Sequence, residues 1–278
     1  MTTIPTVRFR DGHEIPQLGY GVWKVEDEVA ETVVGQAIDA GYRHIDTARI
    51  YGNEEGVGRA IAATSVPRED LFITTKLWND DQKHDDALKA IDDSLARLQL
   101  DHVDLYLIHW AAPHRGTYLE AWKAMQEIHE SGKATSIGVS NFPVAQLEEI
   151  IEATGSVPVI HQIEVHPYHQ QRELRAANEK HGIVTQAYSP LGHGGELLQD
   201  PVITEIAEAK GATPAQVVLA WHLAHGIVAI PKSVTEERII SNFKAADVTL
   251  TEDELARIDA LDKGDEGRVG ADPATMDF

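Results

Sequence analysis

Apolar and polar positions follow two alternating periods along most of the chain. Short apolar runs, typical of buried strands, are separated by longer stretches in which apolar residues recur every three or four positions, the spacing of an amphipathic helix. Within residues 84–100, for example, one helical face carries Leu88, Ile91, Leu95 and Leu98. Strands that alternate with helices in this way favour an α/β fold with a parallel sheet and crossover helices.

The strand-like runs predict eight βα units. Seven clear runs occupy residues 43–48, 71–77, 103–110, 135–141, 159–165, 183–191 and 227–233. A weaker eighth run occupies residues 245–250. Eight units in about 250 residues are typical of a (β/α)8 barrel, and no linker or low-complexity segment divides the chain. We therefore expect residues 1–278 to form one TIM barrel domain.

Turn and cap residues mark the boundaries of these elements. Asp11 and Gly12 lie between two short runs in residues 6–19, which predicts a β-hairpin, and we interpret this hairpin as a plug over one end of the barrel. Capping boxes predict helix starts at Thr213 and Thr251. Helix ends are expected at glycines that suit left-handed C-caps, namely Gly41, Gly182 and Gly211.

Composition narrows the classes of function. Hydrophobic residues make up 42% of the 278 residues, enough for a large core, and the net charge of −21 disfavours binding to nucleic acid or anionic membranes. We find no apolar run of about 18 residues that would predict a membrane span, and no apolar N-terminal region typical of a secretory signal. The lack of cysteine excludes disulfides and thiolate metal sites. We expect a cytoplasmic monomer in which any anionic ligand needs a local basic patch.

Polar residues interrupt the strand-like runs at the same end each time. In α/β barrels the carboxyl ends of the strands form the mouth of the active site. These ends carry, in chain order, Asp46, Lys76, His109, Ser140 with Asn141, Gln162 with Glu164, Tyr188 with Ser189, and Lys232 with Ser233. An ordinary salt bridge that closes the barrel would explain only Asp46 and Lys76 among these residues. Seven strands with polar ends indicate an active site.

Seven segments together resemble the aldo-keto reductases. The motifs are GYRHIDTARIYGNEEGVG at residues 41–58, LFITTKLWN at 71–79, VDLYLIHW at 103–110, IGVSNF at 137–142, QIEVHP at 162–167, AYSPLG at 187–192 and IPKSVTEERIISN at 230–242. The match spans residues 7–262. Within the family the chain is most similar to the bacterial 2,5-diketo-D-gluconate reductase group.

This resemblance implies an NADPH-dependent reductase of aldehydes and ketones, residue by residue. The implied catalytic tetrad is Asp46, Tyr51, Lys76 and His109. Cofactor contacts are implied for Val22, Asp46, Ser140, Asn141, Gln162, Tyr188, Ser189, Pro190, Leu191, Gly192, Lys232, Ser233, Val234, Thr235, Arg238 and Asn242. Two positions depart from the family pattern: Arg49 stands where a small residue is common, and Ser241 stands where many members have a glutamate.

The chemistry of carbonyl reduction explains these residue types. Tyrosine is a poor proton donor at neutral pH because its ordinary pKa is near ~10. A cation about 4 Å away, at an effective dielectric of ~20, favours the phenolate by ~4 kcal/mol before desolvation is subtracted. We expect Lys76 to lower the pKa of Tyr51 in this way, with Asp46 orienting Lys76 and a neutral His109 donating a hydrogen bond to the carbonyl oxygen. The substrate slot is predicted to be lined by Trp23, Tyr51, Trp78, His109 and Trp110.

Residues 232–238 supply the basic patch that an anionic cofactor needs. Thr235 is expected to be a helix N-cap, with Arg238 in the first turn and Lys232 just before it. A helix N-terminus with two cations suits a phosphate group. The pattern therefore favours the 2′-phosphate of NADPH over NADH.

Other ligand sites have weaker support. The chain has no Gly-x-Gly-x-x-Gly motif and no P-loop. His222 and His225 are expected to be solvated helix residues, so no metal site is predicted. Two alternatives remain: a cofactor-binding module without turnover, like the potassium-channel accessory subunits built on this fold, and a metal-dependent barrel hydrolase. The hydrolase would need a cluster of His and Asp at the strand ends, where only His109 and Asp46 qualify.

Overall fold

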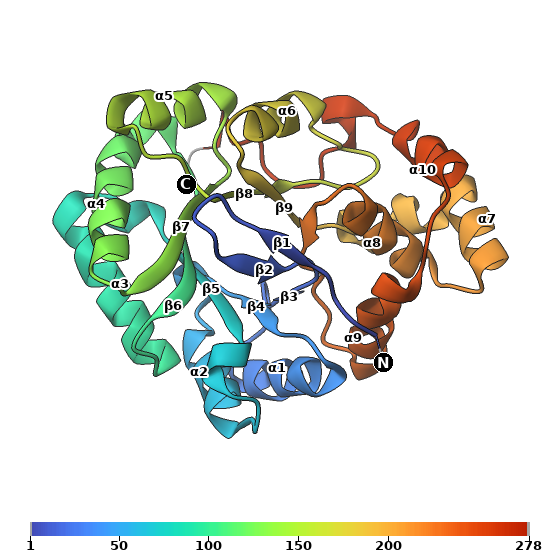
Figure 1. Cartoon of the computed structure of the whole chain (residues 1–278), viewed down its shortest axis with the longest axis horizontal. Coiled ribbons are helices and arrows are strands. Elements are labelled where there is room, and N and C mark those ends of the chain that lie inside the picture. Colours follow the sequence, from blue (N-terminus) through green and yellow to red (C-terminus); the bar gives the residue numbers. More distant parts are fainter. Residues whose placement is uncertain (1, 277–278) are drawn as a thin grey trace.

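Eight parallel strands form a curled sheet with helices around it in the computed structural model, which describes residues 2–276 (Figure 1). The strands are β3 (Tyr20–Gly21), β4 (His44–Asp46), β5 (Phe72–Leu77), β6 (Val103–Ile108), β7 (Ala134–Ser140), β8 (Ile160–Glu164), β9 (Val184–Tyr188) and β10 (Val228–Ala229). Each strand pairs with its neighbour in chain order. Between β10 and β3, a parallel bridge from Leu18 to Ala229 and the hydrogen bond from Gly19 N–H to the Ala229 carbonyl (2.9 Å) close the circle. The prediction of a (β/α)8 barrel is confirmed.

One strand assignment from the sequence is wrong. The first barrel strand is β3 and not residues 43–48, and residues 245–250 form no strand, because Lys244–Asp247 is a 3₁₀ helix. The strand β3 has only two residues and follows a glycine that packs tightly, since a Cβ on Gly19 would lie 2.3 Å from Nδ1 of His44. Such a segment has no apolar run to detect. Every later strand therefore holds one place further round the barrel than predicted.

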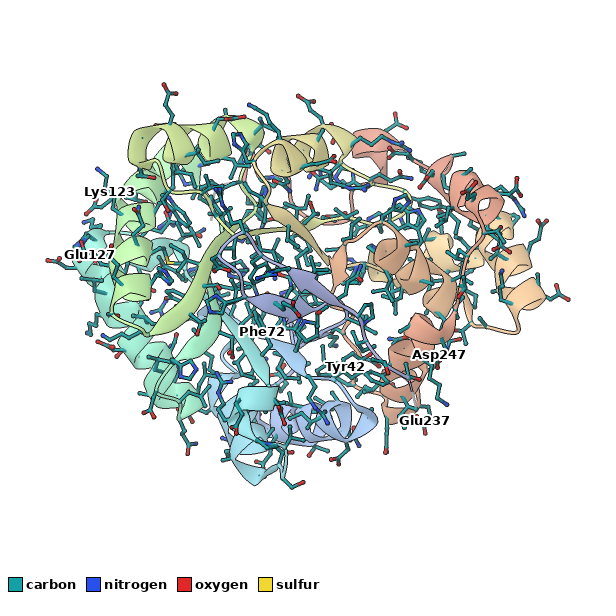
Figure 2. All side chains as sticks on the ribbon, viewed as in Figure 1. Tyr42, Phe72, Lys123, Glu127, Glu237 and Asp247 are labelled. Carbon is teal, nitrogen blue, oxygen red and sulfur yellow. The ribbon has the colours of Figure 1, made fainter. Side chains whose placement is uncertain are left out.

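Ten α-helices surround the sheet among the described residues. They are α1 (Asp27–Ala40), α2 (Glu54–Ala63), α3 (His84–Leu98), α4 (Tyr118–Glu130), α5 (Val144–Thr154), α6 (Arg172–Lys180), α7 (Pro201–Lys210), α8 (Pro214–Ala224), α9 (Glu236–Phe243) and α10 (Glu252–Asp259). No helix in residues 2–276 combines the length and apolar character needed to cross a bilayer. Figure 2 shows Tyr42 and Phe72 directed into the interior, whereas Lys123 and Glu127 on α4 project outward.

The helix caps predicted from the sequence are largely confirmed. Thr213 and Thr251 each form a complete capping box. Gly41 and Gly211 are left-handed C-caps. Helix α6 is capped by His181, and the left-handed Gly182 follows directly. Local sequence signals therefore predict these boundaries between helices and loops.

The N-terminal hairpin closes the end of the barrel opposite the strand carboxyl ends. Strand β1 (Thr6–Arg8) pairs with β2 (Glu14–Pro16) in antiparallel register, and both lie over the centre of the barrel in Figure 1. Phe9 and Ile15 are buried in a cluster with Phe72 at the start of β5. The hairpin thus fills the amino end of the barrel as predicted and leaves the other end open for chemistry.

Candidate active site

A buried ion pair lies at the carboxyl ends of β4 and β5. Nζ of Lys76 is 2.5 Å from Oδ1 of Asp46 and donates a second hydrogen bond to the Thr47 carbonyl at 2.7 Å. Oδ2 of Asp46 accepts from Nε2 of Gln162 at 2.7 Å. The side chains of Lys76 and Asp46 are 0% and 2% exposed. Burial lowers the pKa of Lys76 and raises that of Asp46, and each partner opposes the shift of the other.

Tyr51 and His109 lie next to this pair. Tyr51 ends the 3₁₀ turn Arg49–Tyr51, and Nζ of Lys76 lies 5.1 Å from the centroid of its ring. The rings of Tyr51 and His109 meet edge to face, with centroids 5.6 Å apart. The structure therefore places the four side chains of the predicted tetrad within hydrogen-bonding or ring-contact distance of one another.

The pKa of Tyr51 moves in the direction opposite to our expectation. Burial, the Asp46 carboxylate and Tyr188 raise it well above 10. The physical reason is that burial, the largest cause, disfavours the charged phenolate, and that the Asp46 carboxylate beside Lys76 repels the same negative charge. Burial and Lys76 lower the pKa of His109 well below its ordinary value. His109 is therefore neutral at pH 7, as predicted.

Asn53 and Glu54, which we did not predict as site residues, fix the position of the Tyr51 turn. The buried amide of Asn53 donates to the carbonyls of Val22 (2.9 Å) and Val25 (2.8 Å). The buried carboxylate of Glu54 accepts from Oγ1 of Thr75 at 2.6 Å and also pairs with Arg97. Their place in the YGNE motif, one residue beyond the tyrosine, was the available signal.

The residues predicted to surround a nicotinamide come together around β7, β8 and β9. Oη of Tyr188 donates to Oδ1 of Asn141 at 2.7 Å, and Nδ2 of Asn141 donates to the His109 carbonyl at 3.0 Å. Ser140 and Gln162 are buried beside them, and Tyr188 is half-buried. Hydrogen bonds among these side chains thus link the tetrad to the end of β9.

Glu164 has a different role from Gln162 although both lie on β8. Its buried carboxylate accepts from the N–H groups of Val269 (2.6 Å) and Gly270 (2.7 Å) and pairs with Nε2 of His166 at 3.1 Å. Although burial alone would raise the pKa of Glu164, His166 and these two N–H groups lower it below its ordinary range. Glu164 therefore anchors the C-terminal segment at the barrel mouth.

The predicted phosphate and adenosine contacts lie around the ends of β9 and β10. Ser189 and Gly192 have left-handed backbone, Leu191 is half-buried and Pro190 is buried. Lys232, Val234, Thr235 and Arg238 are exposed, Ser233 is half-buried and Asn242 is largely buried. Lys232 and Arg238 form no ion pair with another described residue. These two cations are therefore available to an external anion.

Two residues predicted to contact the cofactor, Thr235 and Val22, have hydrogen-bond partners that the sequence did not predict. Thr235 occupies the N-cap position of α9 as expected, but its side chain makes no capping hydrogen bond, and the Arg238 N–H donates to the Thr235 carbonyl (3.0 Å). Val22 is fully buried, and its N–H and carbonyl bond to Asp46 and Asn53. Val22 thus has no exposed backbone group for a cofactor, and its contact stays a prediction.

Aromatic side chains surround His109 as the sequence indicated. The ring of Trp78 contacts His109 edge to face with centroids 5.4 Å apart, and Trp110 stacks on it at 6.5 Å. Trp23 is 43% exposed and stacks on His193, which lies in the loop after β9, at 5.8 Å. Trp78 and Trp110 thus line the mouth near the tetrad, whereas Trp23 lies next to the predicted phosphate segment.

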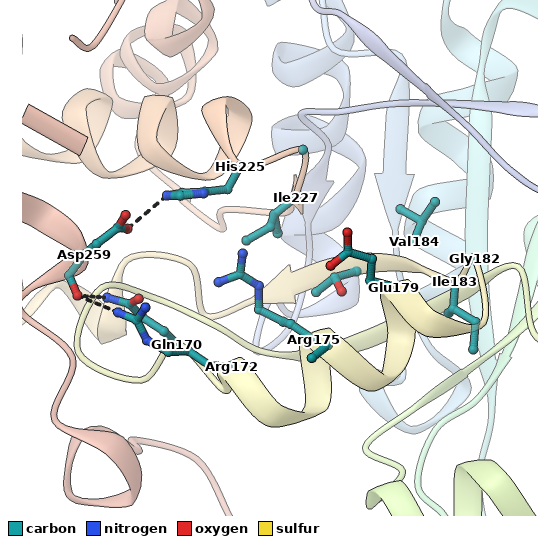
Figure 3. Close-up of a pocket in the computed structure, with 13 residues that line it drawn as sticks. Gln170, Arg172, Arg175, Glu179, Gly182, Ile183, Val184, His225, Ile227 and Asp259 are labelled. Carbon is teal, nitrogen blue, oxygen red and sulfur yellow. Dashed lines mark hydrogen bonds and ion pairs between the residues drawn. The ribbon is translucent and has the colours of Figure 1, made fainter. Parts of the chain in front are cut away.

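A groove of about 570 Å³ lies elsewhere, along α6 and the start of β9 (Figure 3). Asp259 on its wall pairs with Nε2 of His225 at 2.9 Å, and its carbonyl accepts from Gln170 and Arg172. None of the tetrad residues lines this groove. It is therefore separate from the candidate active site.

The expectation that His222 is solvated is wrong. Its ring is fully buried, with Nδ1 2.8 Å from the Val218 carbonyl oxygen and Nε2 3.0 Å from the Val165 carbonyl oxygen. Burial lowers its pKa to about 4. His225 is partly exposed and paired with Asp259. Among residues 2–276, no group of three or more His, Asp or Glu side chains has the geometry of a metal site.

Comparison with known proteins identifies the family. The family model for the aldo/keto reductase family matches residues 17–263. The chain is 50% identical to an aldo-keto reductase of Mycolicibacterium smegmatis over 99% of this chain and 98% of that protein. It is 51% identical to methylglyoxal reductase DkgA of Escherichia coli over 97% of each chain. A crystal structure of a Gox0644 variant in complex with NADPH superimposes with a TM-score of 0.95 at 46% identity, covering 99% of this chain and 100% of that one. The barrel is closed by a hairpin and holds a buried Asp46–Lys76 pair beside Tyr51 and His109. Together with the family match and these relatives, this shows that the chain belongs to the aldo/keto reductase family.

Proposed function

We propose that this protein reduces aldehyde and ketone carbonyls to alcohols with NADPH and that Tyr51 donates the proton. The observation that carries the proposal is the Lys76–Asp46 pair, 0% and 2% exposed, placed beneath Tyr51 and beside a neutral His109. A buried ion pair costs desolvation free energy, so its position next to a phenol and an imidazole is typical of an active site.

The residues at the mouth fit the cofactor. NADPH supplies the hydride when bound. Lys232 and Arg238 present two cations that no described residue pairs, in a chain of net charge −21, and they suit a phosphate. The half-buried ring of Tyr188, fixed through its hydroxyl by Asn141, provides a flat surface beside the tetrad. The relative crystallised with NADPH supports the same choice.

Tyr51 and His109 have different roles at the carbonyl oxygen of the substrate. A high pKa keeps Tyr51 protonated, and a protonated phenol can donate to the strongly basic alkoxide oxygen that develops during reduction. Nδ1 of His109 is buried without a hydrogen-bond partner among the described residues. Because an orphaned N–H is rarer than an orphaned acceptor, we assign the proton to Nε2, which then donates to the carbonyl oxygen. Lys76 stabilises the phenolate left on Tyr51.

Replacing the proton donor tests this proposal. We expect Tyr51→Phe to lower kcat by ~10²–10⁴, the usual contribution of a general acid, while the Kd of NADPH stays unchanged. The kinetics are followed at 340 nm with methylglyoxal, the substrate in the name of the Escherichia coli relative, and Kd is measured by quenching of tryptophan fluorescence. A variant that keeps more than about a tenth of the native kcat would remove Tyr51 from this role. Native protein that binds NADPH without turnover of any aldehyde would favour the non-catalytic alternative.

A further inference from the structure

The turn after β5, which begins at Trp78, is linked by ion pairs to the two loops that carry Tyr51 and His109. Asp81 in the 3₁₀ turn Asn79–Asp81 pairs through Oδ2 with Nη1 of Arg49 at 2.7 Å, and Arg49 begins the turn of Tyr51. Asp80 pairs with Nη1 of Arg115 in the loop after β6, also at 2.7 Å. Two adjacent carboxylates thus link loops on both sides of Trp78.

The buried side-chain amide of Gln82 strengthens the link between the turn after β5 and the loop after β6. Nε2 of Gln82 donates to the Trp110 carbonyl at 2.6 Å, and its Oε1 accepts from Oγ1 of Thr117 at 2.8 Å. Gln82 is 1% exposed. The loop with His109 and Trp110 is therefore held by both a buried hydrogen-bond pair and an ion pair. The Tyr51 turn is linked to the turn after β5 by the Arg49–Asp81 ion pair.

The Tyr51 turn needs such a contact because packing does not hold its outer side. A hollow of about 480 Å³ is lined there by Arg49, Ile50 and Gly52 among others. Ile50 is 46% exposed. Asn53 and Glu54 fix the end of the turn, and Arg49 fixes its beginning. Loss of the Arg49–Asp81 pair would leave the beginning of the turn free to shift into the hollow.

We propose that Arg49 and Asp81 are positioning residues that set substrate specificity, because their ion pair fixes the separation between the turns of Tyr51 and Trp78, whose rings both contact His109. This inference rests on the proposed function. The rings of Tyr51 and Trp78 contact the His109 ring at 5.6 and 5.4 Å, so a shift of either loop changes the width of the slot. The residue that departs from the family pattern, Arg49, thereby restricts the size of the carbonyl substituent.

The test is a double-mutant cycle with two aliphatic aldehydes that differ in bulk. kcat and KM are measured for propanal and cyclohexanecarbaldehyde with Arg49→Met, Asp81→Asn and the double variant. We expect each single change to shift the ratio of the two kcat/KM values toward the bulky aldehyde by about threefold to tenfold. The double variant should shift it no further than either single one, because the residues act through one contact.

The control variant is Glu205→Gln. It removes one carboxylate from the ion pair of Glu205 with Arg257, which joins α7 to α10 at 2.6 Å and lies outside the mouth loops. We expect it to leave the ratio unchanged. Native turnover with an unchanged ratio in all Arg49 and Asp81 variants, or equal shifts in Glu205→Gln, would overturn the inference alone. Native protein without turnover of either aldehyde would refute the proposed function and with it the assigned role of Arg49.

Discussion

Replacing Lys76 with methionine tests two roles of the buried Lys76–Asp46 ion pair: its contribution to the stability of the fold and its contribution to catalysis. Nζ of Lys76 is fully buried with two hydrogen-bond acceptors, so the variant leaves the Asp46 carboxylate without its cation in a buried site. Removal of one partner of a buried pair costs about 3–5 kcal/mol. For a chain of 278 residues this corresponds to a decrease in Tm of about 5–9 °C. Activity should be lost over the whole usable pH range.

The pH dependence of this decrease in Tm provides the sharper measurement. Burial raises the pKa of Asp46, and loss of Lys76 removes the charge that opposes this shift. A carboxyl with a raised pKa in the folded state stabilises the fold when it is protonated, and this stability is lost as pH rises through the folded pKa. The difference in Tm between native protein and Lys76→Met should therefore shrink as pH falls from about 8 to about 5.

Calorimetry of the native protein, Lys76→Met and the double variant Lys76→Met with Asp46→Asn measures these effects. The double variant has no unpaired charge, so it should recover part of the lost Tm at pH 8 while staying inactive. A Lys76→Met protein with native Tm and native kcat would refute the roles that we give to both residues. A difference in Tm that grows on acidification would refute the assignment of the destabilisation to an ionised Asp46.

The remaining predictions concern the cofactor and the C-terminal segment. Arg238→Ala should raise the Kd of NADPH by about tenfold and leave that of NADH nearly unchanged, because one charge-assisted contact is lost; equal losses for both cofactors in fluorescence titrations would contradict a 2′-phosphate site. Glu164→Gln should speed release of the C-terminal residues by carboxypeptidase, because the N–H groups of Val269 and Gly270 lose a charged acceptor. In the native protein this anchor should persist above pH of about 4 and weaken only below it, since the lowered pKa keeps Glu164 ionised; a digestion rate unaffected by the substitution would count against the anchor.

The sequence predicted that Asp46, Lys76 and His109 lie close together because carboxyl ends of parallel strands meet at one end of a barrel, whereas Tyr51 was added by the resemblance to the family. Asp46, Lys76 and His109 each end an apolar run, so counting strands was enough to bring them together even with the first strand misplaced. Local caps such as Thr213 were predictable for a similar reason, because their hydrogen bonds reach only three residues along the chain.

Features that depend on partners distant in the sequence could not be predicted. The bond from Gln162 to Asp46 joins residues far apart in the chain, and the burial of His222 depends on the loop after β8. We predicted the shift in the pKa of Tyr51 in the wrong direction because we treated Lys76 as an isolated cation near the phenol. In the structure burial is the largest influence on the pKa of Tyr51, and the Asp46 carboxylate, 2.5 Å from Lys76, raises it further.

The closure of the barrel also bears on how the chain folds during synthesis. Residues 18 and 229, which meet at the closing seam, are separated by most of the chain, so β3 has no partner on its outer edge until β10 has been made. An open strand edge is a site of aggregation, and contacts between distant residues form slowly. The same two-residue length and close-packed glycine that hide β3 from the sequence pattern make it a poor template for another chain. The nascent barrel is thus protected at its unpaired edge by the weakness of that strand.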